Sequence, residues 1–245
     1  MIYKGFATMY DAFMADVPYE SWAAYLNDVL SQKVEKGGIV LDLACGTGNI
    51  TLKLAKMGYD MIGVDMSEDM LAEANRKAYE DGLSILFLAQ DMQELDLYGT
   101  IDAAVCVCDG LNYILNEEGL AKVFNRVKLF MNPGGIFIFD MNTEYKFKKT
   151  YADRSFEANT ADGAWYTWDN LYDEDKKINE YSMTFFESED DDEPFIETHY
   201  QKAYDTQAIC KMILDTGFSS VKIFDDYTKG DVHENTARVV FVAET

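Results

Sequence analysis

The chain has 245 residues, of which 44 are Asp or Glu and 21 are Lys or Arg, so its formal net charge is −23. Hydrophobic residues make up 48% of the sequence, which is typical of a globular protein and excludes a disordered one. At this length we expect one large domain with room for a subdomain. So acidic a surface repels phosphate backbones and anionic lipid, which disfavours nucleic acid and membranes as partners and favours a neutral or cationic small molecule. RNA could be a substrate only if the surface carried a local basic patch.

Cysteine and histidine are too sparse to indicate a disulfide framework or a metal site. The four cysteines are Cys45, Cys106, Cys108 and Cys210, and the two histidines are His199 and His233. Cys106 and Cys108 lie two apart in an apolar run, so we expect them on one face of a strand as reduced thiols. The N-terminus lacks the apolar stretch of a signal peptide, and no apolar run is long enough to span a membrane. We therefore expect a cytoplasmic protein without a metal.

Short apolar runs alternate with amphipathic segments up to residue 142. An amphipathic helix is predicted at 19–34. The predicted strands are 39–44, 60–65, 84–90, 101–108 and 135–141, and the predicted helices between them are 49–57, 67–79 and 117–131. The strand segments are apolar at nearly every position, as parallel strands covered by helices on both faces must be. The alternation predicts a doubly wound, Rossmann-like α/β fold.

The pattern changes after residue 142. The segments 165–187 and 195–204 are aromatic and partly alternating, which predicts three antiparallel strands laid over one edge of the core, with the acidic block 187–193 as a solvated hairpin tip. A helix at 205–216 and an antiparallel strand pair at 220–227 and 237–244 then complete a mostly parallel, seven-stranded sheet. The predicted division is therefore a core at 37–142, an inserted β subdomain at 143–204 on the substrate side, and a return to the core at 205–245.

The most informative stretch is 40–50, VLDLACGTGNI, which combines a strand, a glycine-rich turn and a helix start. Such a turn brings backbone N–H groups close to a ligand, and Gly46 and Gly48 allow that close approach. A dinucleotide site would have a third glycine where this chain has Thr51, and here Asp42 precedes the loop. These two differences disfavour NAD.

Asp42-x-Ala44-x-Gly46-x-Gly48 resembles motif I of the class I S-adenosylmethionine (SAM)-dependent methyltransferases. Ala44 stands where a glycine is common in that family, so we expect an ordinary backbone conformation there. SAM carries an ammonium and a sulfonium and no phosphate, so carboxylates near the loop suit it. The resemblance implies SAM as cofactor and S-adenosylhomocysteine as product.

Three further segments fit the same resemblance. Asp65 ends the second strand, where it can accept hydrogen bonds from both ribose hydroxyls, with Met66 beside it. Asp91 and Met92 follow the third strand, at the family's adenine site. Asp109 follows the fourth strand, where family members contact the methionine part of SAM and the substrate.

The N-terminal Phe6-Ala7-x-x-Tyr10-Asp11, the inserted sheet and Arg238 resemble a bacterial subgroup related to small-molecule N-methyltransferases. In such proteins an N-terminal segment folds over the cofactor, so residues 1–36 are expected to form a helical lid from which Tyr3 and Tyr10 touch SAM.

The favoured function is in-line transfer of the SAM methyl group to a nitrogen or oxygen of a small neutral or cationic molecule. Asp109, Tyr113 and His199 are the candidates for substrate contact or proton removal, although His199 is expected at a polar-facing strand position. The alternatives are a methyltransferase acting on RNA or protein, an NAD-dependent oxidoreductase and a non-catalytic SAM-binding protein. The sequence leaves the oligomeric state open, with a homodimer among the options.

Overall fold

The structure is a computed structural model that describes residues 10–11, 14–159, 165–186 and 194–245. Its central sheet has seven strands in the order β10-β11-β5-β4-β1-β2-β3. Their bounds are β1 Ile39–Leu43, β2 Asp60–Asp65, β3 Leu86–Ala89, β4 Ile101–Cys106, β5 Met131–Asn142, β10 Ser220–Asp225 and β11 Arg238–Glu244. All neighbouring pairs are parallel except those made by β11, which runs antiparallel to both β5 and β10. The doubly wound, mostly parallel sheet is thus confirmed.

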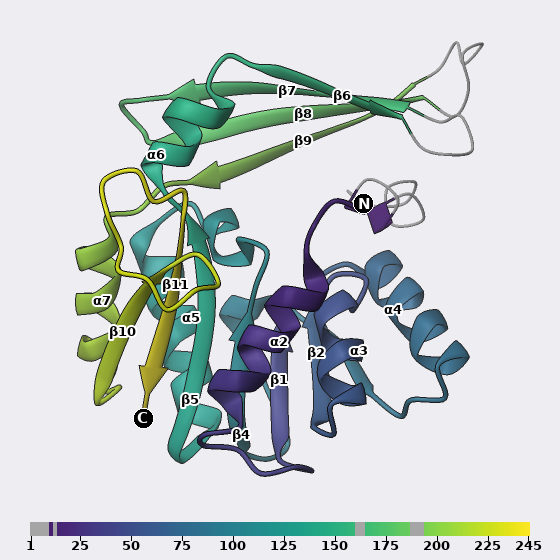
Figure 1. Cartoon of the computed structure of the whole chain (residues 1–245), viewed down its shortest axis with the longest axis vertical. Coiled ribbons are helices and arrows are strands. Elements are labelled where there is room, and N and C mark those ends of the chain that lie inside the picture. Colours follow the sequence, from purple (N-terminus) through teal and green to yellow (C-terminus); the bar gives the residue numbers. More distant parts are fainter. Residues whose placement is uncertain (1–9, 12–13, 160–164, 187–193) are drawn as a thin grey trace.

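Helices cover both faces of this sheet, as the unbroken apolar strands require (Figure 1). The bounds are α2 Tyr19–Leu30, α3 Asn49–Lys56, α4 Glu68–Glu80, α5 Glu117–Phe130 and α7 Thr206–Asp215. Successive strand residues point to opposite faces. Val40 packs in the cluster that contains residues of α2 and α3, whereas Leu41 packs in the cluster that contains residues of α5 and α7.

Side-chain caps begin four of the helices and explain where they start. Ser67 accepts a hydrogen bond from the N–H of Met70 at the start of α4, as the sequence predicts, and Asn116 and Asp205 do the same for α5 and α7. Thr143 caps the short helix α6, Glu144–Lys146, which a turn of π-helix extends to Tyr151. Each cap satisfies an N–H group that would otherwise lack an intrahelical partner.

A second, antiparallel sheet lies across the carboxyl ends of the parallel strands (Figure 1). Its strands are β6 Ser155–Asn159, β7 Trp165–Asp173, β8 Ile178–Phe186 and β9 Phe195–Lys202. The expected inserted sheet is present, but it has four strands, because the short segment 155–159 carries too little apolar pattern to be recognised as a strand. The acidic block 187–193 and Tyr3 lie outside the described residues.

The side chain of Asn112 ties the two sheets together at their junction. Its amide nitrogen donates to the carbonyl oxygens of Asn142 and Lys202, at 3.1 and 2.8 Å, and its amide oxygen accepts from the N–H of Asn142 at 2.9 Å. Asn142 ends β5 and Lys202 ends β9, so one buried amide holds the core and the inserted sheet in one arrangement.

Several strand boundaries differ from the sequence expectation, among them those of β4 and β5. β4 ends at Cys106, and Cys108 lies beyond it in a left-handed backbone conformation (φ 58°), so the two thiols do not share a strand face. β5 begins at Met131 and not at Gly135, because Met131 already pairs with Ile101 before a register shift. The four cysteines are free, and no helix of the described ranges is long and apolar enough to cross a membrane.

Replacing Asn112 by alanine should destabilise the fold. The variant loses three hydrogen bonds and leaves backbone groups of Asn142 and Lys202 buried without partners, so we expect the free energy of unfolding to fall by about 2–4 kcal/mol. Urea unfolding measures this loss. Asn125→Ala, which removes an exposed amide on α5, is the matched control and should change stability little. Equal unfolding midpoints for the two variants would refute the assigned role of Asn112.

Candidate functional site

The glycine-rich loop between β1 and α3 is built from three left-handed residues. The φ angles of Ala44, Gly46 and Gly48 are 57°, 53° and 78°. The expectation of an ordinary conformation at Ala44 was therefore wrong. This residue holds a conformation that glycine adopts more easily, and alanine there stores strain in the loop.

The two glycines serve different needs. A Cβ atom at Gly48 would lie 2.8 Å from Leu52 Cδ1 and 3.1 Å from the Cβ of Ala74, so Gly48 allows α3 and α4 to pack closely. A Cβ at Gly46 would meet nothing within 4 Å. Of the pair, Gly46 is the one whose backbone faces open space where a ligand can approach.

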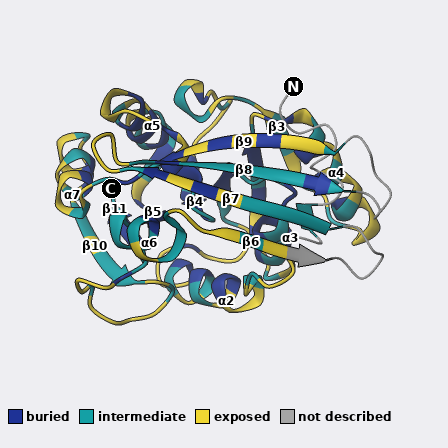
Figure 2. Cartoon of the chain, turned by 90° about the horizontal axis from the view of Figure 1, so that it is seen from above, coloured by how far each residue is buried: buried dark blue, intermediate teal, exposed yellow. Residues whose placement is uncertain are grey.

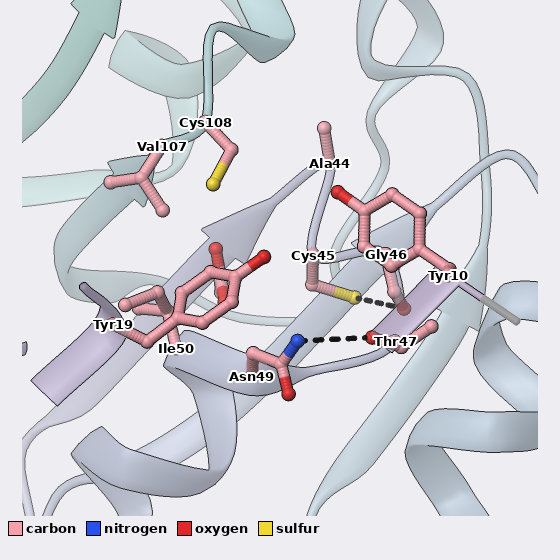
Figure 3. Close-up of a pocket in the computed structure, with 11 residues that line it drawn as sticks. Tyr10, Tyr19, Ala44, Cys45, Gly46, Thr47, Asn49, Ile50, Val107 and Cys108 are labelled. Atoms are coloured by element: carbon pink, nitrogen blue, oxygen red, sulfur yellow. Dashed lines mark hydrogen bonds between the residues drawn. The ribbon is translucent and has the colours of Figure 1, made fainter. Parts of the chain in front are cut away.

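A pocket lies against this loop, at the point where the strand order reverses between β1 and β4 (Figure 3). Ligands of doubly wound sheets bind at such a switch point. Residues from three segments line it: Tyr10 and Tyr19 from the N-terminal segment, Asp42 to Ile50 of the loop except Leu43 and Gly48, and Val107 and Cys108 after β4. Of the residues expected to bind the cofactor, Tyr10, Asp42, Ala44 and Gly46 therefore meet in one pocket.

Asp42 is a buried carboxyl with one oxygen unpaired. Its Oδ2 accepts a hydrogen bond from Thr51 Oγ1 at 2.5 Å, while its Oδ1 has no hydrogen-bond partner among the described residues. Burial raises the pKa of Asp42 to about 7. An orphaned carboxylate oxygen that lines a pocket suits an ammonium ligand, which supplies the missing donor and the missing charge.

Asp65 holds the loop in place from the end of β2. Its Oδ2 accepts from the N–H of Gly46 at 2.8 Å and its Oδ1 from the N–H of Ser67 at 2.9 Å. Burial raises its pKa. Each carboxylate oxygen can accept a second hydrogen bond, so these contacts leave acceptor capacity for the two hydroxyls of a ribose.

Met66, Asp91 and Met92, also expected to bind the cofactor, lie outside the pocket lining. Met66 is 68% exposed, directly after Asp65. Asp91 is exposed and caps the short 3-10 helix that begins at Met92, accepting from the N–H of Gln93 at 2.8 Å. Met92 is half-buried against the core. These residues follow the carboxyl ends of β2 and β3, at the same edge of the sheet as the glycine-rich loop.

The N-terminal segment is anchored to the loop by Asp11, which the sequence analysis did not assign. Its Oδ1 accepts from Thr47 Oγ1 and from the amide of Asn49, at 2.6 and 2.8 Å, and its Oδ2 pairs with Lys77 Nζ at 2.6 Å. Tyr10 is therefore held at the pocket by its neighbour.

The division of the chain into a lid at 1–36, a core, an inserted subdomain and a C-terminal return remains a prediction.

Asp109 belongs to a buried ionic network. It has a left-handed backbone (φ 54°), its N–H donates to Asp140 Oδ1 at 2.7 Å, and its carboxylate accepts from Arg238 at 2.9 Å and from Gln201 at 2.5 Å. Arg238 also pairs with Asp140 and stacks over the ring of Trp22. Burial alone would raise the pKa of Asp109, but the charges of Arg238 and Lys146 lower it.

This network contains residues that sequence reasoning missed. Asp140 is a fully buried acid that follows the apolar run 136–139 of strand β5, and such a charge needs a partner. Arg238, which begins the largely apolar strand β11, could have been predicted as that partner. The sequence offers no such sign for Gln201, because its role depends on where the inserted sheet lies.

Tyr113 and His199 meet at the junction of the core with the inserted sheet. Their rings lie edge to face with centroids 5.9 Å apart, and the hydroxyl of Tyr113 is hydrogen-bonded to that of Tyr181. His199 is only 4% exposed, and it shares the buried side of β9 with the polar residues Glu197 and Gln201, so its polar-facing position does not expose it to solvent. It stacks on Tyr181, and its Nε2 lies 3.1 Å from Glu197 Oε2, a partner that was not foreseen.

The raised pKa of Asp42 should make stability depend on pH. Because this carboxyl holds its proton in the folded chain up to about pH 7 and releases it near pH 4 when unfolded, the unfolding free energy falls as pH rises through that window. Asp42→Asn does not titrate, so its stability should fall less steeply over the same range. Denaturant unfolding at several pH values measures both slopes, and Asp60→Asn, at the exposed start of β2, is the control. Identical slopes for the parent and Asp42→Asn would contradict the assignment.

Comparisons with known proteins agree with this site. A sequence profile of the methyltransferase domain matches residues 40–135, which include the loop, Asp65 and Asp91. One relative is a Bacillus subtilis protein that carries the name methyltransferase YqeM. It is 34% identical over 249 residues, which cover 100% of this chain and 97% of the relative. A glycine/sarcosine N-methyltransferase of Halorhodospira halochloris is 29% identical over 128 residues, covering 51% of this chain and 48% of that protein.

A solved structure matches the whole fold. The crystal structure of a SAM-dependent methyltransferase from Clostridium acetobutylicum superposes with a TM-score of 0.87 at 29% identity and covers 99% of this chain and 98% of that one. The match extends over the inserted sheet as well as the core. The chain therefore belongs to the SAM-dependent methyltransferases, with SAM as its cofactor.

Proposed function

We propose that this enzyme transfers the SAM methyl group to a nitrogen or oxygen of a small neutral or cationic molecule that lies between the pocket and the inserted sheet. The observation that carries this proposal is the position of Tyr10. It lines the pocket, and it also packs in one cluster with Tyr166 and Met183 of the inserted sheet. An acceptor held against that sheet lies next to the mouth of the cofactor pocket.

The chain's own residues fit SAM in three places. Asp42 would hold the ammonium with its unpaired oxygen, and Asp65 the ribose hydroxyls. Asp91, Met92 and Met66 would hold the adenine, with Gly46 leaving room for the ligand at the loop. When bound, SAM supplies a methyl group attached to a positively charged sulfur. Its leaving group is the neutral thioether S-adenosylhomocysteine.

The acceptor's lone pair forms the new bond to the methyl carbon as the carbon–sulfur bond breaks, and the acceptor then loses its proton. The chief contribution of the protein is alignment, which can supply roughly 7–11 kcal/mol of the barrier. We assign substrate contact to Tyr113 and proton removal to His199, whose ring is held in place by the contact of its Nε2 with Glu197. Asp109, already paired with Arg238 and Gln201, would position the loop and add negative charge near the cofactor.

A small acceptor is favoured over RNA or protein. The relative from Halorhodospira is named for methylation of the small amines glycine and sarcosine. The net charge of −23 opposes a phosphate backbone. A protein acceptor with a basic segment is the second candidate. A cytoplasmic location and a homodimer remain predictions.

Asp65→Ala should weaken SAM binding about ten-fold or more, because the paired ribose contact is lost and the Gly46 N–H loses its acceptor. Calorimetric titration with SAM measures the change. Asp215→Ala, which removes an exposed carboxylate on α7, should leave the affinity as it is in the parent. If Asp65→Ala binds SAM as tightly as Asp215→Ala does, Asp65 has no ribose role.

Methyl transfer itself should be seen with small acceptors and not with RNA. The assay combines the enzyme, SAM carrying a labelled methyl group, and separate pools of small amines, small hydroxyl compounds, basic peptides and RNA. Label should move to a compound of the first two pools, and Tyr113→Phe and His199→Gln should slow this transfer while SAM binds normally. Label moving to RNA or peptide alone would overturn the proposal.

A further inference from the structure

The inserted sheet turns a polar face toward the core. Along β9, Glu197, His199 and Gln201 are buried while the residues between them are exposed (Figure 2). Alternate residues of a strand share a face. Because Gln201 reaches Asp109 in the core, this buried side of the sheet, here called the inward face, is the one that looks toward the cofactor pocket.

Most of the unsatisfied polar atoms of the structure lie on this inward face. Among the described residues, five buried side-chain atoms lack a hydrogen-bond partner, and Asp42 Oδ1 in the pocket is one of them. The other four are Trp168 Nε1, Tyr172 Oη, Asn179 Oδ1 and Glu197 Oε1. A buried polar group without a partner is costly, so such a concentration points to a ligand that supplies the missing partners.

Two of these atoms sit in one row across the sheet. Trp168 on β7 is paired with Met183 on β8, and Met183 is paired with Glu197 on β9. Directly paired residues share a face, and neighbouring strands lie about 4.8 Å apart, so the backbones of Trp168 and Glu197 are separated by roughly 10 Å. Met183, between them, packs in the cluster that contains Tyr10 of the pocket lining. The row therefore lies next to the lining of the cofactor pocket.

The chemistry of the row selects its ligand. Glu197 is 4% exposed, and its second oxygen is fixed by His199, whose ring is in turn stacked on Tyr181. The free oxygen, Oε1, can only accept hydrogen bonds when ionised, and it attracts a cation. The indole N–H of Trp168 can only donate, so it needs an acceptor such as a hydroxyl oxygen. The rings of Tyr151 and Tyr181, at 5.0 and 5.6 Å from that of Trp168, supply aromatic faces around the same place.

We propose that the row Trp168–Met183–Glu197 is the acceptor subsite of this enzyme and that it binds a hydroxyl-bearing amine, with the nitrogen at Glu197 and a hydroxyl at Trp168. This inference rests on the proposed function, since it names the class of acceptor for the same methyl transfer. It assigns to Glu197 a direct contact with the acceptor nitrogen. His199 then fixes the direction of the Glu197 carboxylate.

The test uses three simple probes with the protein loaded with S-adenosylhomocysteine. Glucosamine carries an amine and hydroxyls, glucose lacks the amine, and cyclohexylamine lacks the hydroxyls. Calorimetry or ligand-observed NMR should show glucosamine binding at least about ten-fold more tightly than either of the others. Glu197→Gln should remove this preference for glucosamine over glucose, while its affinity for S-adenosylhomocysteine stays that of the parent.

Two further variants keep the result interpretable. Glu180→Gln makes the same change on the opposite face of β8 and should bind glucosamine as the parent does. Trp168→Phe keeps an aromatic ring but removes the donor, so it should weaken binding of glucosamine and leave cyclohexylamine unchanged. This second variant tests the row even if Glu197→Gln fails to fold.

The outcomes separate this inference from the proposed function. Equal glucosamine binding by the parent and Glu197→Gln, or no preference for glucosamine in the parent, would overturn the acceptor subsite. Mass spectrometry of reactions with SAM decides the other question. If the parent methylates a small acceptor while Glu197→Gln does so equally well, the proposed function stands and the subsite falls. If glucosamine binds through Glu197 but no small acceptor gains a methyl group, the row is an amine-binding site without being an acceptor subsite, and the proposed function falls.

Discussion

The geometry of the site depends on the buried ion pairs that the guanidinium of Arg238 makes with two aspartates. From β11 it pairs with Asp140 on β5 and with Asp109 after β4, while Gln201 of the inserted sheet binds the same Asp109 carboxylate. One cation thus connects three strands of the core, the loop beside the pocket and the second sheet. Removing a single member would leave an uncompensated charge in the interior, which is more damaging than losing an exposed ion pair.

Much of the core could be predicted from the sequence because each of its features is local. The unbroken apolar strands, the cap at Ser67 and the glycine-rich loop after Asp42 each follow from a short stretch of chain. The inserted sheet was harder to predict. Its fourth strand, 155–159, is short, and the burial of His199 depends on a partner surface that a single strand does not disclose.

The site shows the same division. The residues of the glycine-rich loop meet because they are close in sequence, whereas Arg238, Gln201 and Glu197 reach the site through long-range pairing of strands. Ala44 is a different case. Sequence alone gives no reason to expect a left-handed alanine, which is held there by the surrounding loop contacts rather than by its own preference. The residues that bind the cofactor could thus be predicted from the sequence, whereas those expected to recognise the acceptor are found only once the fold is known.

The amide of Asn112 has a consequence for how such an enzyme can change. Because this single side chain and the Gln201–Asp109 contact help to fix the second sheet over the core, the inward-facing positions of β7, β8 and β9 other than Gln201 can vary without moving the cofactor pocket. Acceptor choice and cofactor binding then depend on different parts of the chain. Exchange of those strands between relatives, with Asn112, Asp109 and Gln201 retained, offers a direct route to enzymes with new acceptors on an unchanged cofactor-binding core.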